Sequence, residues 1–72
     1  MISFEPLWNT MKEKGETTYT LITQHGIDKK IIHRMKHNQN VTLQTLEKLC
    51  FILNCKIEDV VEISFEASDN SQ

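Results

Sequence analysis

The stretch from Thr42 to Asn54 is the most regular part of the chain and constrains the fold more than any other feature. Thr42 is a residue type that caps the first turn of a helix, and Asn54 tolerates the left-handed backbone that often ends one. Between them, apolar residues recur at spacings of three and four, which predicts an α-helix with one apolar face. These residues are Leu43, Leu46, Leu49, Cys50 and Leu53.

Three shorter helices are predicted before this one, because capping residues and glycine flank segments with helical apolar spacing. Only two glycines and one proline occur in 72 residues, which favours helices over many short strands. The predicted helices are Pro6 to Lys14, ending before Gly15; a helix of about two turns, capped by Thr17 or Thr18 and ended by Gly26; and Lys29 to His37, after the cap Asp28. Their apolar faces are Leu7, Trp8 and Met11; Leu21 and Ile22; and Ile32 and Met35.

The last third of the chain predicts a short fifth helix and then a strand. The helix is expected from Ile57 to Val61. Residues 61–65 and residues 2–4 both alternate between apolar and polar, which is typical of strands. Because a strand needs a partner, residues 61–65 are expected to pair either with residues 2–4 or with their own copy in a second chain.

The length and these elements predict one all-α domain, a compact bundle of five helices with short terminal β-strands as an option. The domain is expected to span residues 1–66, and residues 67–72 are expected to be a disordered polar tail. No segment predicts a membrane span or a signal peptide, so a cytoplasmic protein is expected.

Charge is unevenly distributed along the chain, although the formal net charge is only −2. Four basic residues lie between Asp28 and His37, whereas every charged residue after Lys56 is acidic. One face of the molecule is therefore expected to be basic and suited to nucleic acid, even though the whole protein is acidic.

Residues 17–36, TTYTLITQHGIDKKIIHRMK, have the pattern of a helix, a glycine-containing turn and a second helix. Leu21, Ile22, Ile27, Ile32 and Met35 have the spacing needed to pack two short helices against each other. The second helix then presents mostly cationic side chains outward, and a helix of this kind fits the major groove of DNA.

The ordered set of these features resembles the Cro/CI-like (XRE) family of helix-turn-helix repressors, from about Leu7 to Val61. The resemblance rests on the Thr17 cap, Gly26-Ile27 in the turn, and the later Leu53-Asn54 and Ile57 to Val61. It implies a lambda-repressor-like bundle and a prokaryotic or phage regulator, most often a repressor. The chain departs from the family at Ile22, where a small residue is common, and at Asn38, where glycine is common.

The resemblance also implies roles for individual residues on double-stranded DNA. The base-reading candidates are Lys29, Lys30, Ile31, His33 and Arg34, with Ile31 facing a thymine methyl group. The phosphate-contacting candidates are Thr17, Thr18, Lys36, His37, Asn38, Asn40 and Thr42. A homodimer on a palindromic site is expected, because one small module gives limited discrimination between sequences.

Other functions have weaker support in the sequence. His33 and His37 have a spacing that suits zinc, but two ligands are incomplete, so no metal site is expected. Neither Trp8 nor Tyr19 is expected to be a stacking platform, and Trp8 is expected in the core. Cys50 and Cys55 are expected to be buried reduced thiols. No catalytic set, cofactor motif or small-molecule site is evident, so an enzyme is not expected.

A second hypothesis is a protein-interaction module that has this fold without strong DNA binding, of the antitoxin or anti-repressor type. The acidic last third of the chain and the apolar residues at 61–65 support it. Steep salt dependence of DNA binding would count against this hypothesis.

Overall fold

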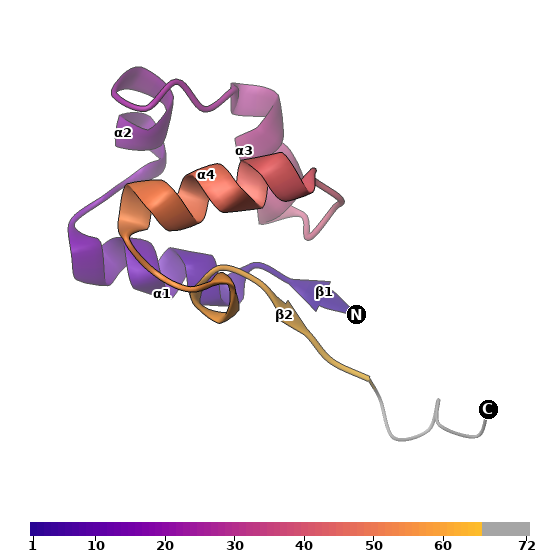
Figure 1. The fold of residues 1–72 in the computed structure, drawn as a ribbon. Helices are drawn as coiled ribbons and strands as arrows, with labels where there is room; N and C mark the ends of the chain where they lie inside the picture. The colour runs from indigo at the N-terminus through magenta and orange to yellow at the C-terminus, as the bar shows by residue number, and fades with distance from the viewer. Residues whose placement is uncertain (66–72) are drawn as a thin grey trace.

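Four α-helices and a two-stranded sheet form the part of the chain that the structure, a computed structural model, describes: residues 1–65. The polar tail predicted at residues 67–72 lies outside the described residues. In Figure 1, α4 crosses the middle, with α2 and the start of α3 above it and α1, η1 and the sheet below. The elements are β1 (Ile2–Ser3), α1 (Glu5–Lys14), α2 (Thr18–Thr23), α3 (Lys29–Lys36), α4 (Leu43–Leu53), the 3-10 turn η1 (Ile57–Asp59) and β2 (Glu62–Ile63).

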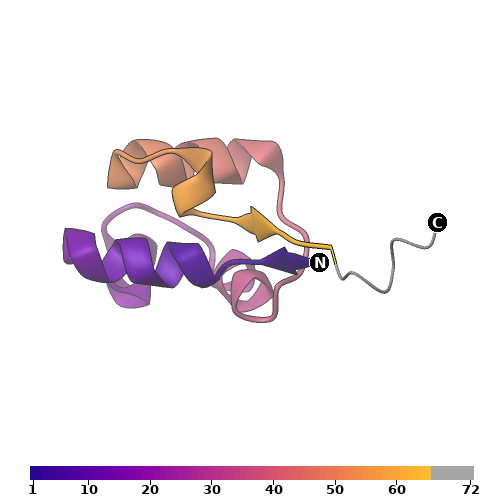
Figure 2. The ribbon, with the colours of Figure 1, turned by 90° about the horizontal axis from the view of Figure 1, so that it is seen from below.

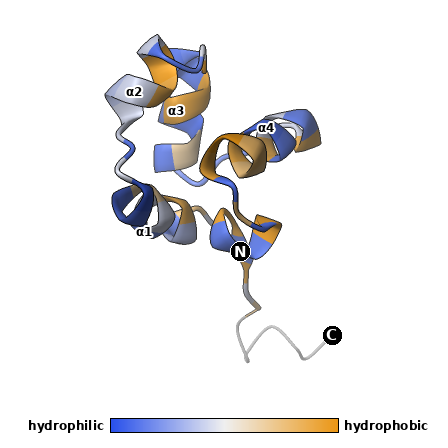
Figure 3. Cartoon of the chain, turned by 60° about the vertical axis from the view of Figure 1, so that its left-hand side comes forward, coloured by the Kyte–Doolittle hydropathy of each residue, from blue (hydrophilic) through white to orange (hydrophobic). Residues whose placement is uncertain are grey.

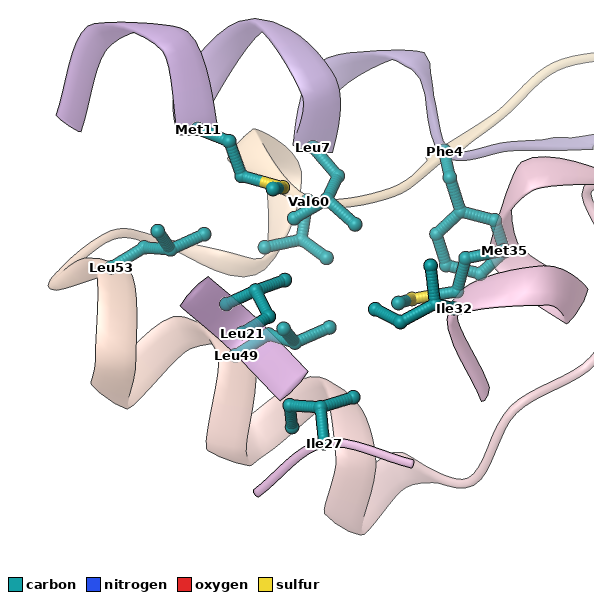
Figure 4. Packing of buried hydrophobic residues seen from close by; sticks show 10 residues of the cluster. All are labelled: Phe4, Leu7, Met11, Leu21, Ile27, Ile32, Met35, Leu49, Leu53 and Val60. Atoms are coloured by element: carbon teal, nitrogen blue, oxygen red, sulfur yellow. The ribbon is translucent and has the colours of Figure 1, made fainter. Parts of the chain in front are cut away.

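Ten apolar side chains meet in one core, to which each of the four α-helices contributes, as Figure 4 shows. Leu7, Leu21 and Leu49 are fully buried, and Phe4 projects toward the inner face of α3. The full set is Phe4, Leu7, Met11, Leu21, Ile27, Ile32, Met35, Leu49, Leu53 and Val60. α2 contributes only Leu21 to this set, whereas α1, α3 and α4 contribute two residues each, so the position of α2 depends most on the packing of the other helices.

The ends of α1, α3 and α4 share one geometry, in which a single residue adopts left-handed backbone. Gly15 has φ 73°, Asn38 has φ 56° and Asn54 has φ 52°. The N–H of the following residue then donates to the carbonyl five residues earlier, which completes a Schellman motif and reverses the chain within a few residues. These bonds are Glu16 to Met11 at 2.9 Å, Gln39 to Arg34 at 2.8 Å and Cys55 to Cys50 at 3.0 Å.

Asn38 does more than end α3, as its side chain also ties that helix to the start of α1. The Asn38 Oδ1 accepts a hydrogen bond from the Phe4 N–H at 2.9 Å. The predicted left-handed conformation of Asn38 is confirmed, and this bond gives a reason for asparagine where the resemblance leads one to expect glycine.

Replacing Asn38 separates its two contributions. Asn38→Ala is expected to destabilise the fold by about 2–3 kcal/mol, because alanine is strained at positive φ and cannot accept the bond. Asn38→Gly loses only the bond, so a smaller loss of about 1 kcal/mol is expected. Urea unfolding followed by circular dichroism measures both. Equal stability of Asn38→Gly and the parent would show that the bond to Phe4 contributes nothing.

The strand of the last third pairs within the chain. β2 is antiparallel to β1, with Ile2 opposite Ile63 and Ser3 opposite Glu62. The Ser64 N–H extends the pairing by donating to the Met1 carbonyl at 2.9 Å. Figure 2 shows the two strands side by side at one end of the molecule. Of the two partners that the sequence left open for residues 61–65, the structure has the one in the same chain, so the fold is mostly helical rather than all-α.

The predicted fifth helix is the short turn η1, and the prediction of a helix from Ile57 to Val61 is wrong in extent. Two long-range contacts limit the length of this helix. The Thr10 hydroxyl donates to the Asp59 carbonyl at 2.7 Å, which ties the turn to α1. The chain must then extend to pair with β1 from Glu62 onward. The second helix has the predicted length of about two turns, from Thr18 to Thr23, and Gly26 lies in the turn after it with φ 72°.

Leu43 is the clearest error in the predicted core, because its side chain is 82% exposed. At about 100° per residue, each step of three residues turns back by roughly 60°, so Leu43 lies roughly 120° around the helix from Leu49. The predicted burial of Trp8 is partly right, because Trp8 packs half-buried against the core. Tyr19 is 72% exposed. Cys50 and Cys55 are half-buried rather than buried, and both are free thiols.

Candidate nucleic-acid interface

The sequence around Asp28 starts α3 firmly. Asp28 has extended backbone, and its carboxylate accepts a hydrogen bond from the Lys30 N–H at 2.8 Å, which caps the helix. Ile32 and Met35 then face the core, three residues apart. The alternation of hydrophilic and hydrophobic colour along α3 in Figure 3 reflects these two faces. The helix is therefore anchored on one side and presents the other to solvent.

The outward face of α3 is cationic. Lys29, Lys30, Arg34 and Lys36 are all exposed, and within residues 1–65 none of them forms an ion pair. The exposed rings of His33 and His37 lie one turn apart, with centroids 4.4 Å apart and planes inclined at 55°. Charges that are left unpaired by the protein are available to an anionic partner such as a phosphate backbone.

The turn before α3 is held in place from both sides. Gly26 supplies a positive φ, and the Ile27 N–H donates to the Leu21 carbonyl at 3.0 Å while the Ile27 side chain is buried. Glu16 connects the first part of α2 to the turn that follows it. Its carboxylate accepts a hydrogen bond from the Thr20 hydroxyl at 2.6 Å and lies 3.5 Å from His25 Nε2. α2 and α3 therefore form one supported helix-turn-helix unit.

The two predicted phosphate contacts on α2 lie at its first turn. Thr17 is the N-cap, and its hydroxyl accepts from the Thr20 N–H at 3.1 Å while the Thr20 hydroxyl accepts from the Thr17 N–H at 2.9 Å. The Thr17 hydroxyl oxygen is therefore already used as an acceptor within the protein, and the reciprocal capping fixes the start of the helix. Thr18 is half-buried in the first turn. Of these two residues only Thr17 is exposed, so the Thr17 side of the first turn is the part of α2 open to solvent.

The remaining predicted phosphate contacts lie at the far end of α3 and in the connection to α4. Lys36, His37, Asn38 and Asn40 are exposed. An eight-residue helix is roughly 12 Å long, so these residues lie about that distance from the Asp28 cap. Thr42 is also exposed, but its hydroxyl caps α4 by accepting from the Thr45 N–H at 3.2 Å. The candidates thus follow a line along α3 rather than a single cluster.

A shallow hollow of about 240 Å³ lies between the helix-turn-helix unit and the start of α4. Ile27 and Ile31 give it apolar lining, and Gln44, Thr45 and Lys48 come from α4. Sequence reasoning missed these three α4 residues, because nothing local to α4 shows that its first turns lie beside the start of α3. Lys48 is exposed and adds a fifth basic side chain close to the cationic face.

Ile31 differs from the other base-reading candidates. It was expected to point outward with the lysines, but it is half-buried and packs against the core. The first turns of α3 and α4 line the same hollow, and Ile31 lies in it beside residues of α4. The neighbouring helix therefore covers part of the Ile31 side chain. Only part of the Ile31 side chain is therefore available to a thymine methyl group.

No group of three or more metal-ligating side chains forms within residues 1–65, so His33 and His37 gain no further ligand there. Over the same residues, no helix is both long and apolar enough to cross a membrane.

Comparison with known proteins adds to this geometry. A family model described as the Cro/C1-type HTH DNA-binding domain matches residues 6–66. The chain belongs to this family. The Cro/C1-type match covers the helix-turn-helix unit, α4 and the return to β2, so the resemblance noted in the sequence is confirmed. No curated protein sequence matches the chain.

A solved structure of a transcriptional regulator supports the same assignment. The crystal structure of the transcriptional regulator VanUg, Form II, has 28% sequence identity to the chain and a TM-score of 0.81. The alignment covers 90% of this chain and 87% of that chain, so the likeness extends over the whole domain rather than the helix-turn-helix alone. This Cro/C1-type chain is thus a DNA-binding domain, and its structure is similar to that of a transcriptional regulator.

Proposed function

We propose that this protein regulates transcription by binding specific sites on double-stranded DNA with α3 in the major groove. The observation that supports this proposal most directly is the cationic face of α3, whose four basic side chains are unpaired within residues 1–65. The Asp28 cap and the buried Ile32 and Met35 hold that face rigidly on a Cro/C1-type scaffold. A rigid support matters because base contacts need a fixed helix orientation.

In this proposal, side chains near the start of α3 read bases and those around it contact phosphates. Lys29, Lys30, His33 and Arg34 donate to base edges, above all to guanine O6 and N7. The exposed part of Ile31 contacts a thymine methyl group. Contacts to phosphates come from Thr17, Thr18, Lys36, His37, Asn38, Asn40 and Thr42, and Lys48 joins them. For Asn38 the contact uses the amide nitrogen, since its oxygen is bonded to Phe4.

We propose further that the protein acts as a homodimer and as a repressor. The sheet has exposed apolar side chains, with Met1 75%, Ile2 37%, Ile63 62% and Phe65 79% exposed. Ile2 and Ile63 are directly opposite each other, so they form one apolar surface that a second copy can cover. Two copies would read half-sites one helical turn apart, and a dimer bound there would repress transcription by blocking access of other proteins to the same DNA.

Titration with random-sequence duplex DNA at several salt concentrations tests the proposal, with fluorescence anisotropy as the readout. If each chain neutralises about four phosphates, the slope of log K against log salt is expected to be about −4 per chain. Selection of a preferred sequence from a random pool then tests specificity. Absence of binding at low salt would contradict the proposal.

The second candidate function is protein interaction without strong DNA binding, and the apolar sheet residues are what favour it. The same titration separates the two candidates. A protein-interaction module is expected to bind DNA weakly at all salt concentrations, and its partner contact should be lost in Ile63→Ser. In the regulator, Ile63→Ser is expected to weaken dimer formation, measured by analytical ultracentrifugation, while binding of one chain to a half-site is retained.

A further inference from the structure

The end of α4 brings two cysteines together. Asn54 adopts left-handed backbone, and the Cys55 N–H donates to the Cys50 carbonyl at 3.0 Å while the Asn54 N–H donates to the Phe51 carbonyl at 3.3 Å. In a Schellman motif, the residue that donates the N–H and the residue whose carbonyl accepts it usually also contact each other through their side chains. At the ends of α1 and α3 the corresponding pairs are Met11 with Glu16 and Arg34 with Gln39, whereas at α4 both residues are thiols.

Both thiols are half-buried, and both pack against the edge of the core. Burial raises the pKa of the Cys55 thiol, and the neighbouring Cys50 and Asp59 raise it further, while Lys14 of α1 opposes the change. The groups that face Cys55 therefore come from α4, η1 and α1. None of them belongs to the proposed DNA contacts, so this site does not depend on the proposed function.

We propose that Cys50 and Cys55 form a reversible intramolecular disulfide that closes the C-terminal end of α4. The backbone bond between the two residues already holds their main chains together, as a disulfide requires. Among residues 1–65 the two thiols do not belong to a group of three or more metal-ligating side chains. In a reducing compartment such a bond is transient and responds to the redox state.

The reaction is thiol–disulfide exchange with a small-molecule disulfide such as oxidised glutathione. One cysteine thiolate attacks the glutathione disulfide, which releases one glutathione thiol and leaves a mixed disulfide on the protein. The second cysteine thiolate attacks the protein sulfur of this mixed disulfide and releases the second glutathione thiol. The protein loses two protons and two electrons, and the glutathione disulfide gains both.

The test treats the full chain with oxidised glutathione and follows it by intact-mass spectrometry and thiol titration. We expect a monomer that has lost both thiols and two hydrogen atoms, without bound glutathione, and that regains them with dithiothreitol. The rate should rise from neutral to mildly alkaline pH, because the thiolate is the nucleophile and the pKa of Cys55 is raised. Peptide mapping without reductant should join Cys50 to Cys55.

The matched variants Cys50→Ser and Cys55→Ser are expected to stop at a stable glutathione adduct. Equilibration of the parent chain with mixtures of reduced and oxidised glutathione needs no variant. If α4 positions the pair, the ratio of disulfide to dithiol should be at least about tenfold larger in the folded chain than in urea. A ratio that is equal or smaller when folded, or oxidation that gives only glutathione adducts or chains joined to each other, would overturn the proposal.

Discussion

Replacing Lys30 and Arg34 together by alanine is expected to lower affinity for a selected DNA site by at least about thirtyfold. A well-placed contact between a basic side chain and a guanine contributes about 1–3 kcal/mol of discrimination, and two such contacts are lost. Both side chains are exposed on the outward face of α3, so the fold should be unaffected. Fluorescence anisotropy with the selected duplex and with random duplex at one salt concentration measures the change.

The matched control removes two positive charges elsewhere. Lys12 on α1 and Lys56 before η1 are also exposed, and neither belongs to the proposed interface. Lys12→Ala combined with Lys56→Ala should lower binding to selected and random duplex equally and only slightly. If both double variants lost the same affinity, with no difference between the two duplexes, net charge rather than base recognition by α3 would explain the binding.

Leu49→Ala is expected to destabilise the domain by about 3 kcal/mol, within the range for a leucine truncated in a packed core. The Leu49 side chain is fully buried within the ten-residue core, so its removal leaves a cavity. For a domain of this size, that loss lowers the melting temperature by roughly 10–25 °C. Thermal unfolding followed by circular dichroism gives the change.

Leu43→Ala in the same helix is the control, because Leu43 is 82% exposed. The same truncation should change stability by less than about 0.5 kcal/mol there. Similar large losses at both positions would mean that Leu43 is buried against something else, for which a second copy of the chain is the natural candidate. A concentration-dependent melting temperature would identify that case.

Local chemistry made the helix ends predictable. Thr17, Asp28 and Thr42 cap α2, α3 and α4 with side-chain oxygens, and Asn38 and Asn54 end α3 and α4 with positive φ, as the sequence indicated. A cap depends on residues within four positions of itself, so the necessary information lies in a short stretch of sequence. The outward direction of the basic residues on α3 follows in the same way from the spacing of Ile32 and Met35.

The errors concern contacts between distant parts of the chain. Nothing near Ile57 indicates that Thr10 would take the Asp59 carbonyl, which limits η1 to a short turn. Likewise, Ile31 alone does not reveal that the start of α4 lies beside it. Counting apolar spacings also placed Leu43 in the core, although the drift of three-residue steps turns it away from Leu49. Such positions depend on which elements become neighbours, and that is decided by the whole fold.

The three Schellman ends make the domain sensitive to changes in chain length as well as to residue type. Each ends its helix and redirects the chain with one left-handed residue, so the course of the next segment depends on where that residue stands. A single inserted residue between Arg34 and Gln39 would break the six-residue bond and shift α4 relative to α3. In related proteins, insertions and deletions should therefore be rare at these three turns, even where the residues themselves vary.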